Sequence, residues 1–222
     1  TLGVGRGGPP SWFTAHGFTQ VDYPTLIDYV DVIKRLWRGE TIAHVGPAGD
    51  FKGLRLPDPL DAPPPDVVFF HLGGPQASKA AANPVFDGVA LANITTPDAM
   101  RRSIDMTRKE CERIGRDPTT LRFIAPVTSA PELDETLTRI EVAVRIIVYI
   151  NLPILGDMLI KLNYWDEKIA NDIRNHPAFR NIGSGTVDQH FQREQLVEIS
   201  KMVPDEWLSE VAALGSVDDC VK

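Results

Sequence analysis

Short apolar runs, each followed by a segment with helical spacing, dominate the first part of this sequence. These runs are predicted to be buried strands, and they are residues 1–5, 67–72, 89–94 and 121–127. Continuous apolar strands that alternate with helices are typical of a parallel sheet covered on both faces. The sequence therefore predicts an α/β fold. An open doubly wound sheet and part of a closed (β/α)8 barrel both agree with this number of strands.

The segments between these strands carry apolar residues at helical spacing. Helices are predicted over residues 24–38, 76–82 and 97–114, and two short strands within residues 41–56 are predicted to form a surface hairpin. Thr95 or Thr96 is the expected N-cap of the third helix, because a hydroxyl there accepts a hydrogen bond from a free backbone N–H.

From Leu133 onward the pattern changes to helices alone. The predicted helices are residues 133–150, 156–175, 188–201 and 205–214. The block over residues 133–203 is therefore expected to be a helical insertion or a second lobe. Gly215 ends the last of these helices, and Ser216 is expected to cap a further short helix.

Charge and hydropathy exclude two classes of function. The formal net charge is −7, and Arg101–Arg102 is the longest basic run, so a nucleic-acid surface is not expected. The densest apolar run, Val142–Pro153, is interrupted by Arg145 and Asn151 and is shorter than a membrane span requires. The sequence thus predicts a protein that binds neither nucleic acid nor membrane.

The two cysteines and the chain ends bear on the setting of the protein. Cys111 and Cys220 lie far apart on segments expected to be helical, which favours a reducing cytoplasm over a disulfide scaffold. Residues 1–5 read as the end of a buried strand, and residues 208–222 end in a short helix. We therefore expect a domain that is truncated at both ends.

A first glycine-rich turn follows the opening strand. Gly3 to Gly8 matches the G-x-G-x-x-G dinucleotide fingerprint, but prolines follow where that fingerprint needs a helix. Gly5, Arg6 and Gly7 are instead candidate cofactor-binding residues, because glycine lets backbone approach a ligand and arginine pairs with phosphate. A tight turn with a solvent-facing arginine is the alternative.

A second glycine turn follows the strand at residues 67–72. Gly73 and Gly74 form the turn, and Pro75 and Gln76 open the next helix. Free backbone amides beside glycines can hold a phosphate, so these four residues are also candidate cofactor-binding residues. A βα loop that uses its glycines only to turn remains the alternative.

His71 is the candidate catalytic residue. It lies near the end of a buried strand, where barrels and open sheets place their active sites, and it could donate to a ligand or act as a general acid or base. A structural histidine is the alternative interpretation. No metal site is expected, because His44, His176 and His190 have no companions at metal-ligand spacing.

Several motifs, taken in order, resemble those of a known family. They are Leu2 to Gly7, His16–Gly17, residues 26–40, Gly73 to Ala77, Phe86 to Val89, Pro204 to Trp207 and Gly215–Ser216. In order and spacing the sequence is similar to the bacterial luciferase-like superfamily of flavin- and deazaflavin-dependent oxidoreductases. The likeness is weakest over residues 130–203.

This resemblance implies a fold and a cofactor site. The fold is a (β/α)8 TIM barrel, present here as a partial barrel in one domain over residues 1–222, with residues 133–203 as a mostly helical insertion. The cofactor ring is expected at the carboxyl ends of the strands. An arginine at the position of Arg6 contacts the flavin phosphate in the luciferase branch, and turns that match Gly73 to Gln76 hold phosphate in several members. Gly8 stands where sugar-phosphate dehydrogenases carry a glutamate, which argues against that activity.

The function implied by the resemblance is that of a monooxygenase or dehydrogenase of the luciferase-like class. Such an enzyme moves hydride between its cofactor and a small organic substrate, and the cofactor supplies most of the chemistry. Coenzyme F420 is favoured over FMN because the overall sequence resembles members that use it. A cytoplasmic homodimer is expected. A non-catalytic cofactor-binding member and an inactive scaffold are the alternatives.

Overall fold

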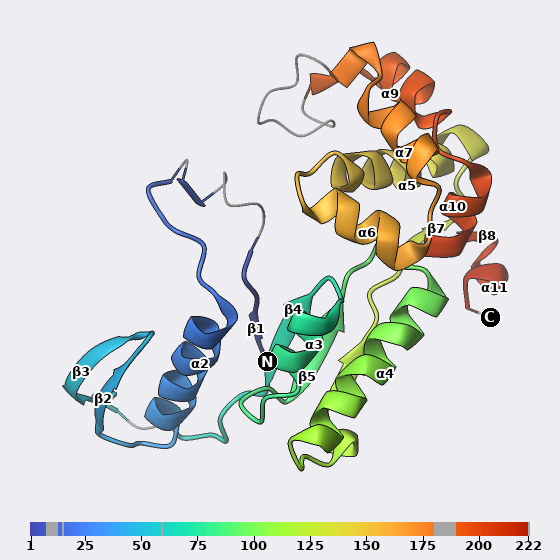
Figure 1. Cartoon of the computed structure of the whole chain (residues 1–222). Coiled ribbons are helices and arrows are strands. Elements are labelled where there is room, and N and C mark those ends of the chain that lie inside the picture. The colour runs from blue at the N-terminus through green and yellow to red at the C-terminus, as the bar shows by residue number, and fades with distance from the viewer. Residues whose placement is uncertain (8–12, 15, 59, 180–189, 222) are drawn as a thin grey trace. The chain divides into compact units, whose positions relative to one another are not determined.

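A computed structural model describes residues 1–7, 13–14, 16–58, 60–179 and 190–221 (Figure 1). The chain divides into two compact units. Unit 1 comprises Thr1–Leu91 with Arg102–Ile124, and unit 2 comprises Ala92–Arg101 with Ala125–Lys222. The assignment of residues 1–222 to a single domain stays a prediction.

Unit 1 is built on a four-stranded parallel sheet in the order β1-β4-β5-β6. The pairing places Val4 beside Phe69, and Phe69 beside Val89. This sheet confirms the α/β prediction and the four predicted strands, although each strand is shorter than expected. The bounds are Leu2–Val4 for β1, Val67–His71 for β4, Gly88–Leu91 for β5 and Arg122–Ile124 for β6.

The helices and the hairpin of this part of the chain also follow the predictions. The bounds are Tyr23–Trp37 for α2, Pro75–Ala81 for α3, Pro97–Arg113 for α4, Ile42–Gly46 for β2 and Gly49–Leu54 for β3. Asp22 caps α2 by accepting a hydrogen bond from the Thr25 N–H at 2.8 Å. The Thr96 hydroxyl accepts from the Ala99 N–H at 3.3 Å, so the cap predicted for α4 is Thr96.

Side chains of β4 alternate between two unlike faces of the sheet. On one face the Phe69 ring lies edge-on to the Tyr23 ring of α2, with 6.0 Å between the ring centroids. It also stacks on the Phe86 ring and contacts the His71 ring, with centroid distances of 4.8 and 5.5 Å. We call this the helix-covered face. Phe70 lies on the opposite face, which we call the open face, and is 44% exposed. The sheet of unit 1 is therefore packed on one side and accessible on the other at Phe70.

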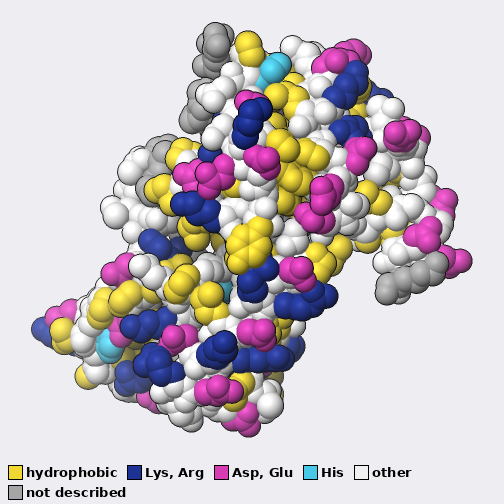
Figure 2. Space-filling model, turned by 45° about the vertical axis from the view of Figure 1, so that its right-hand side comes forward, with side chains coloured by type: hydrophobic (Ala, Val, Ile, Leu, Met, Phe, Trp, Pro, Cys, Tyr) yellow, Lys and Arg dark blue, Asp and Glu magenta, His cyan; other side chains and the backbone are white. Residues whose placement is uncertain are grey.

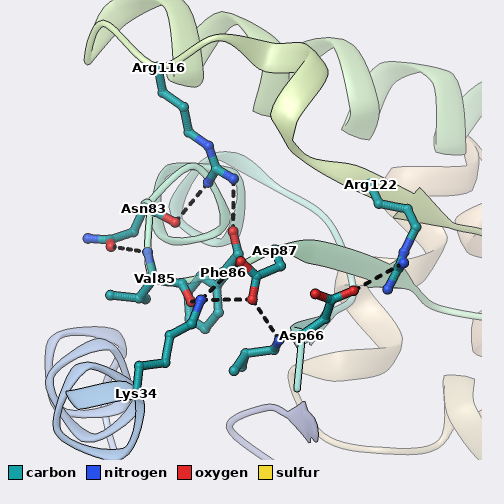
Figure 3. A network of polar contacts seen from close by, with 9 residues as sticks. Lys34, Asp66, Asn83, Val85, Phe86, Asp87, Arg116 and Arg122 are labelled. Carbon is teal, nitrogen blue, oxygen red and sulfur yellow. Dashed lines mark hydrogen bonds and ion pairs between the residues drawn. The ribbon is translucent and has the colours of Figure 1, made fainter. Parts of the chain in front are cut away.

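We call the edge of the sheet at which β4 and β5 begin the amino edge. A polar network lies at this edge (Figure 3). The Asp87 carboxylate accepts from Lys34 Nζ at 2.7 and 2.9 Å and from the Val67 N–H at 2.8 Å. One carboxylate therefore links α2 to the start of β4 and to the residue before β5.

Arg116 completes this network from the segment that follows α4. Its guanidinium donates to the carbonyls of Asn83 and Phe86 at 2.9 and 2.8 Å (Figure 3) and to the Ala82 carbonyl at 3.1 Å. A guanidinium fork matches such a group of carbonyls because it presents five donors in a fixed plane. Arg116 thus orders the connection between α3 and β5.

Unit 2 is mainly helical. Its core includes Ile146, Ile147 and Ile150 of α5, and the rings of Trp165 and Trp207 stack in it at 4.4 Å. The helix bounds are Glu135–Ile150 for α5, Leu155–Asn163 for α6, Glu167–Arg174 for α7, Arg193–Ser200 for α9, Asp205–Val211 for α10 and Val217–Cys220 for α11. Ser216 caps α11, as predicted.

One strand in unit 2, β8, corrects the prediction of helices alone after Leu133, and it pairs with a second strand, β7, that precedes this residue. β7 spans Thr128–Pro131, and β8 spans Ala212–Gly215 and pairs with it in parallel. The helix predicted over residues 205–214 therefore ends at Val211. Pairing with a partner distant in sequence overrides the helical preference of the Ala-Ala-Leu stretch at the start of β8.

The helix predicted over residues 156–175 is two helices. Tyr164 ends α6 in the left-handed conformation with φ of +55°, and Asp166 caps α7 by accepting from the backbone N–H groups of Lys168 and Ile169. The helix predicted over residues 188–201 begins at Arg193, and residues 188 and 189 lie outside the described residues. Local capping chemistry explains the break after α6.

The described residues carry charge of both signs on their surface and have no long apolar helix. Basic and acidic side chains intermingle on the face drawn in Figure 2. No single helix in the described part of the chain is long and apolar enough to cross a membrane. The pair α5 and α6 meets the length and composition test only when both helices are taken together, and they are bent by 118° at the break between them.

Asp87→Ala should destabilise unit 1, because it removes the partner of Lys34 and leaves the Val67 N–H without its acceptor. We expect a loss of about 2 kcal/mol in the free energy of unfolding, measured by urea titration. Asp66→Ala is the matched control at the same edge. Its pair with Arg122, at 3.3 Å, is half exposed on both sides and should contribute less than about 1 kcal/mol. Equal losses would contradict the role given to Asp87.

Candidate functional site

Two glycine turns follow neighbouring strands at the same edge of the sheet. β1 ends at Val4 and leads into Gly5, Arg6 and Gly7, while β4 ends at His71 and leads into the Gly73–Gly74 turn. Because β1 and β4 pair in parallel, both turns lie at their carboxyl ends. We call this the carboxyl edge, and it is where parallel α/β sheets bind ligands.

The Gly73–Gly74 turn has a backbone shape that favours glycine at both positions. Gly73 has φ of +99° and Gly74 has φ of +91°, values that other residues rarely adopt. A Cβ added at Gly74 would meet no atom within 4 Å, so the space beside this residue is open. α3 begins at Pro75, as predicted, and Gln76 is exposed in its first turn. The turn thus presents accessible backbone.

The first turn is more closely packed. A Cβ at Gly5 would lie 3.2 Å from the Phe70 carbonyl oxygen, so glycine allows close approach of the chain to β4. Gly7 has φ of +75°, and the Phe13 ring occupies the space where a Cβ of this residue would stand. Gly5 and Gly7 are both exposed, but a side chain at Gly7 would meet the Phe13 ring and one at Gly5 would meet Phe70.

Arg6 is tied to the start of α2. Its Nε donates to the Val21 carbonyl at 2.8 Å, its Nη2 donates to the Gln20 side chain at 3.3 Å, and its guanidinium lies 4.6 Å from the centre of the Tyr23 ring. These contacts fix the direction of the side chain within unit 1. The contact of Arg6 with phosphate stays a prediction.

His71 is buried at the end of β4, with 4% of its surface exposed. Its Nδ1 accepts a hydrogen bond from the Gly73 N–H at 2.8 Å, which leaves the ring proton on Nε2. Nε2 is buried and has no hydrogen-bond partner among the described residues. Burial lowers the pKa of His71 to about 4, so the imidazole is neutral at pH 7.

Phe70 is a candidate ligand contact that the sequence analysis missed. Phe70 lies on the open face, three residues before the Gly73–Gly74 turn. Its backbone carbonyl and its ring lie next to Gly5 of the first turn. The Val-Val-Phe-Phe sequence of β4 does not alternate apolar with polar residues, so it predicts burial on both faces. Exposure of Phe70 is visible only when the neighbouring strands are placed.

Part of the first glycine-rich segment lies outside the residues that the structure describes. Gly8 and the prolines that argue against a dinucleotide loop belong to residues 8–12, which lie outside the described residues. Within the described ranges, no group of three or more His, Cys, Asp or Glu side chains is arranged to hold a metal ion.

Comparison with known proteins identifies the family. The sequence matches the luciferase-like monooxygenase family over residues 1–222. The chain belongs to this family. No curated protein matches the sequence. The predicted membership in the luciferase-like superfamily is thus confirmed.

Solved structures of luciferase-like enzymes share the fold. The F420-dependent tetrahydromethanopterin reductase from Methanopyrus kandleri is similar with a TM-score of 0.72 and 13% identity, over 99% of this chain and 62% of that one. An F420-dependent secondary alcohol dehydrogenase is similar with a TM-score of 0.61 and 12% identity, over 99% and 57%. The chain spans about three fifths of the length of these structures. The likeness confirms a partial luciferase-like barrel.

Burial of His71 should make the stability of the protein depend on pH. The unfolded side chain takes up a proton near its ordinary pKa of 6.5, whereas the folded one does so only near pKa 4. The unfolded chain therefore binds more protons between these values, and the free energy of unfolding decreases as the pH falls through this window. Between pH 7 and pH 5 we expect the wild type to lose about 2 kcal/mol more than His71→Asn, measured by urea unfolding. The same loss in both proteins would be inconsistent with a buried neutral imidazole.

Proposed function

We propose that this protein is a luciferase-like oxidoreductase that binds coenzyme F420 or FMN at the carboxyl edge of its parallel sheet. The observation that carries the proposal is the placement of two glycine turns at the ends of the neighbouring strands β1 and β4. Family membership supports an oxidoreductase in general, and the reaction that we propose is hydride transfer between the cofactor and a small organic substrate.

The residues at this edge fit the phosphate-bearing part of such a cofactor. The open space beside Gly74 leaves its backbone accessible to a ligand, and Gly73, Pro75 and Gln76 complete the turn that would hold the headgroup. Glycines allow this approach because no side chain stands between backbone and ligand. These four residues are the proposed headgroup contacts.

The first turn and the open face would complete the site. Gly5, Arg6 and Gly7 form the second proposed contact, with Arg6 contributing a permanent positive charge. Phe70 offers an exposed aromatic surface on the open face, against which a flat ring can pack. His71, the buried titratable side chain of β4, lies next to the second turn and accepts a hydrogen bond from the Gly73 N–H.

The chemistry and the protein have separate tasks in this proposal. When bound, the cofactor supplies hydride transfer, and the protein supplies binding, orientation and exclusion of water. The turns bind and orient, and Phe70 excludes water from one side.

The finer parts of the proposal concern the cofactor and the assembly. We favour F420 over FMN, because the two solved structures described above are of enzymes that depend on F420. A small organic substrate, acted on by a dehydrogenase or a monooxygenase reaction, and a cytoplasmic homodimer complete the proposal.

Spectroscopy on the full-length protein tests this function directly. Oxidised F420 and FMN are titrated into the protein, and binding is followed by quenching of cofactor fluorescence. Reduced cofactor is then mixed with a panel of aldehydes, ketones and alkenes, and its reoxidation is followed by absorbance. We expect saturable binding of one cofactor and substrate-dependent reoxidation. Binding without reoxidation would indicate a non-catalytic cofactor-binding protein, and no binding of either cofactor would refute the proposal.

Gly74→Ala should weaken cofactor binding at the proposed headgroup contact. The new methyl group enters the open space beside the turn, and the backbone conformation, with φ of +91° and ψ of 163°, is essentially restricted to glycine and adds strain of about 1–3 kcal/mol. Gly115→Ala is the matched control, because Gly115 also has a positive φ, +77°, with no atom within 4 Å of an added Cβ. We expect both variants to lose thermal stability, while only Gly74→Ala raises the Kd for the cofactor, by about tenfold. An equal Kd in both variants would assign the turn a structural role only.

A further inference from the structure

His71 lies on the helix-covered face of the sheet. It follows Phe69 by two residues, and the two rings are in contact at 5.5 Å. Phe69 in turn packs against Tyr23 of α2 and against Phe86. Phe70, by contrast, is exposed on the open face. The imidazole is therefore directed away from the face on which a cofactor ring would pack.

The imidazole is committed to the backbone of the turn. Nδ1 accepts from the Gly73 N–H at 2.8 Å, a bond that spans two residues and bends the chain immediately after β4. Gly73 is buried, so its N–H has no water to replace this acceptor. Gly73 and Gly74 both have positive φ, which glycine adopts freely, so the bond selects one of several backbone shapes open to this pair.

The second ring nitrogen defines what His71 cannot do. With Nδ1 engaged as an acceptor, Nε2 carries the only proton, and Nε2 is buried without a partner in the described part of the chain. Because the Nδ1 lone pair accepts the Gly73 N–H, Nδ1 is not available as a general base. The low pKa of about 4 agrees with an imidazole that stays neutral.

We propose that His71 is a positioning residue, which holds the Gly73–Gly74 turn in the shape that receives an anionic headgroup and does not itself touch the cofactor. This inference rests on the proposed function for the identity of the ligand. A side chain on the helix-covered face of the sheet thus sets the orientation of the backbone amides at the site.

Two substitutions separate the two nitrogens of the ring. His71→Asn places an amide oxygen near the position of Nδ1 and keeps an acceptor for the Gly73 N–H. His71→Gln places its amide near the position of Nε2 and removes that acceptor. Both variants have similar size and polarity, so each is the control for the other.

The probes are two pairs of ligands that differ in their phosphate-bearing side chain. FMN is compared with riboflavin, and F420 with its phosphate-free deazaflavin core, by the Kd of each for the full-length protein. We expect His71→Gln to reduce the preference for the phosphorylated ligand about tenfold, and His71→Asn to stay within about twofold of the wild type. A general loss of structure would weaken both members of each pair and would not change their ratio.

Two results would overturn the inference. One is an unchanged preference in both variants. The other is a loss in His71→Asn with retention in His71→Gln, which would show that Nε2 contacts the ligand. Absence of any binding by the wild type would instead count against the proposed function.

Nitrogen NMR of the wild-type protein tests the inference without a variant and without a ligand. The imidazole should show an unprotonated Nδ1 and a protonated Nε2, with a scalar coupling between Nδ1 and the Gly73 amide across the hydrogen bond. Where a cofactor binds, the Gly73 and Gly74 amides should shift and the His71 Nε2 signal should not. A protonated Nδ1, or a large shift of Nε2 on binding, would overturn the assignment.

Discussion

Parallel pairing gives the sheet of unit 1 two unlike edges, and the rest of this unit depends on that difference. With Val4 beside Phe69 and Phe69 beside Val89, the strands end together and the chain must turn at a common edge. This register brings the glycines after β1 and β4 to the same edge of the sheet. A shift of one residue in the pairing would also exchange the open face with the helix-covered face.

The amino edge carries the ion pair and the backbone ties, and the carboxyl edge carries the accessible glycines. Asp87 and Arg116 hold α2, β4 and the connection before β5 from below the sheet, if the carboxyl edge is taken as the top (Figure 3). Stabilising contacts at one edge leave the other edge free to be shaped by ligand binding, which is the general arrangement of barrels built from parallel strands.

Local signals predicted much of unit 1. Apolar runs gave the strands, and the Gly-Gly-Pro sequence gave the turn at Gly73 and the start of α3 at Pro75. Three features were not predictable, because each depends on residues distant in sequence. β8 forms because β7 lies beside it, Phe70 is exposed because of the neighbouring strands, and the neutral state of His71 follows from burial. The break at Tyr164 is local, yet aromatic residues seldom adopt positive φ and the sequence offered no warning of it.

A turn whose backbone is already fixed in the ligand-free protein has a thermodynamic consequence. Ordering a flexible glycine pair costs conformational entropy. Where a loop becomes ordered only when the ligand binds, this cost makes the free energy of binding less favourable. The bond from Gly73 to His71 is internal to the protein, so the cost is met during folding. Recognition at this edge should therefore have a smaller unfavourable entropy than recognition by a mobile glycine-rich loop, and the two glycines should show rigid backbone order before any ligand is added.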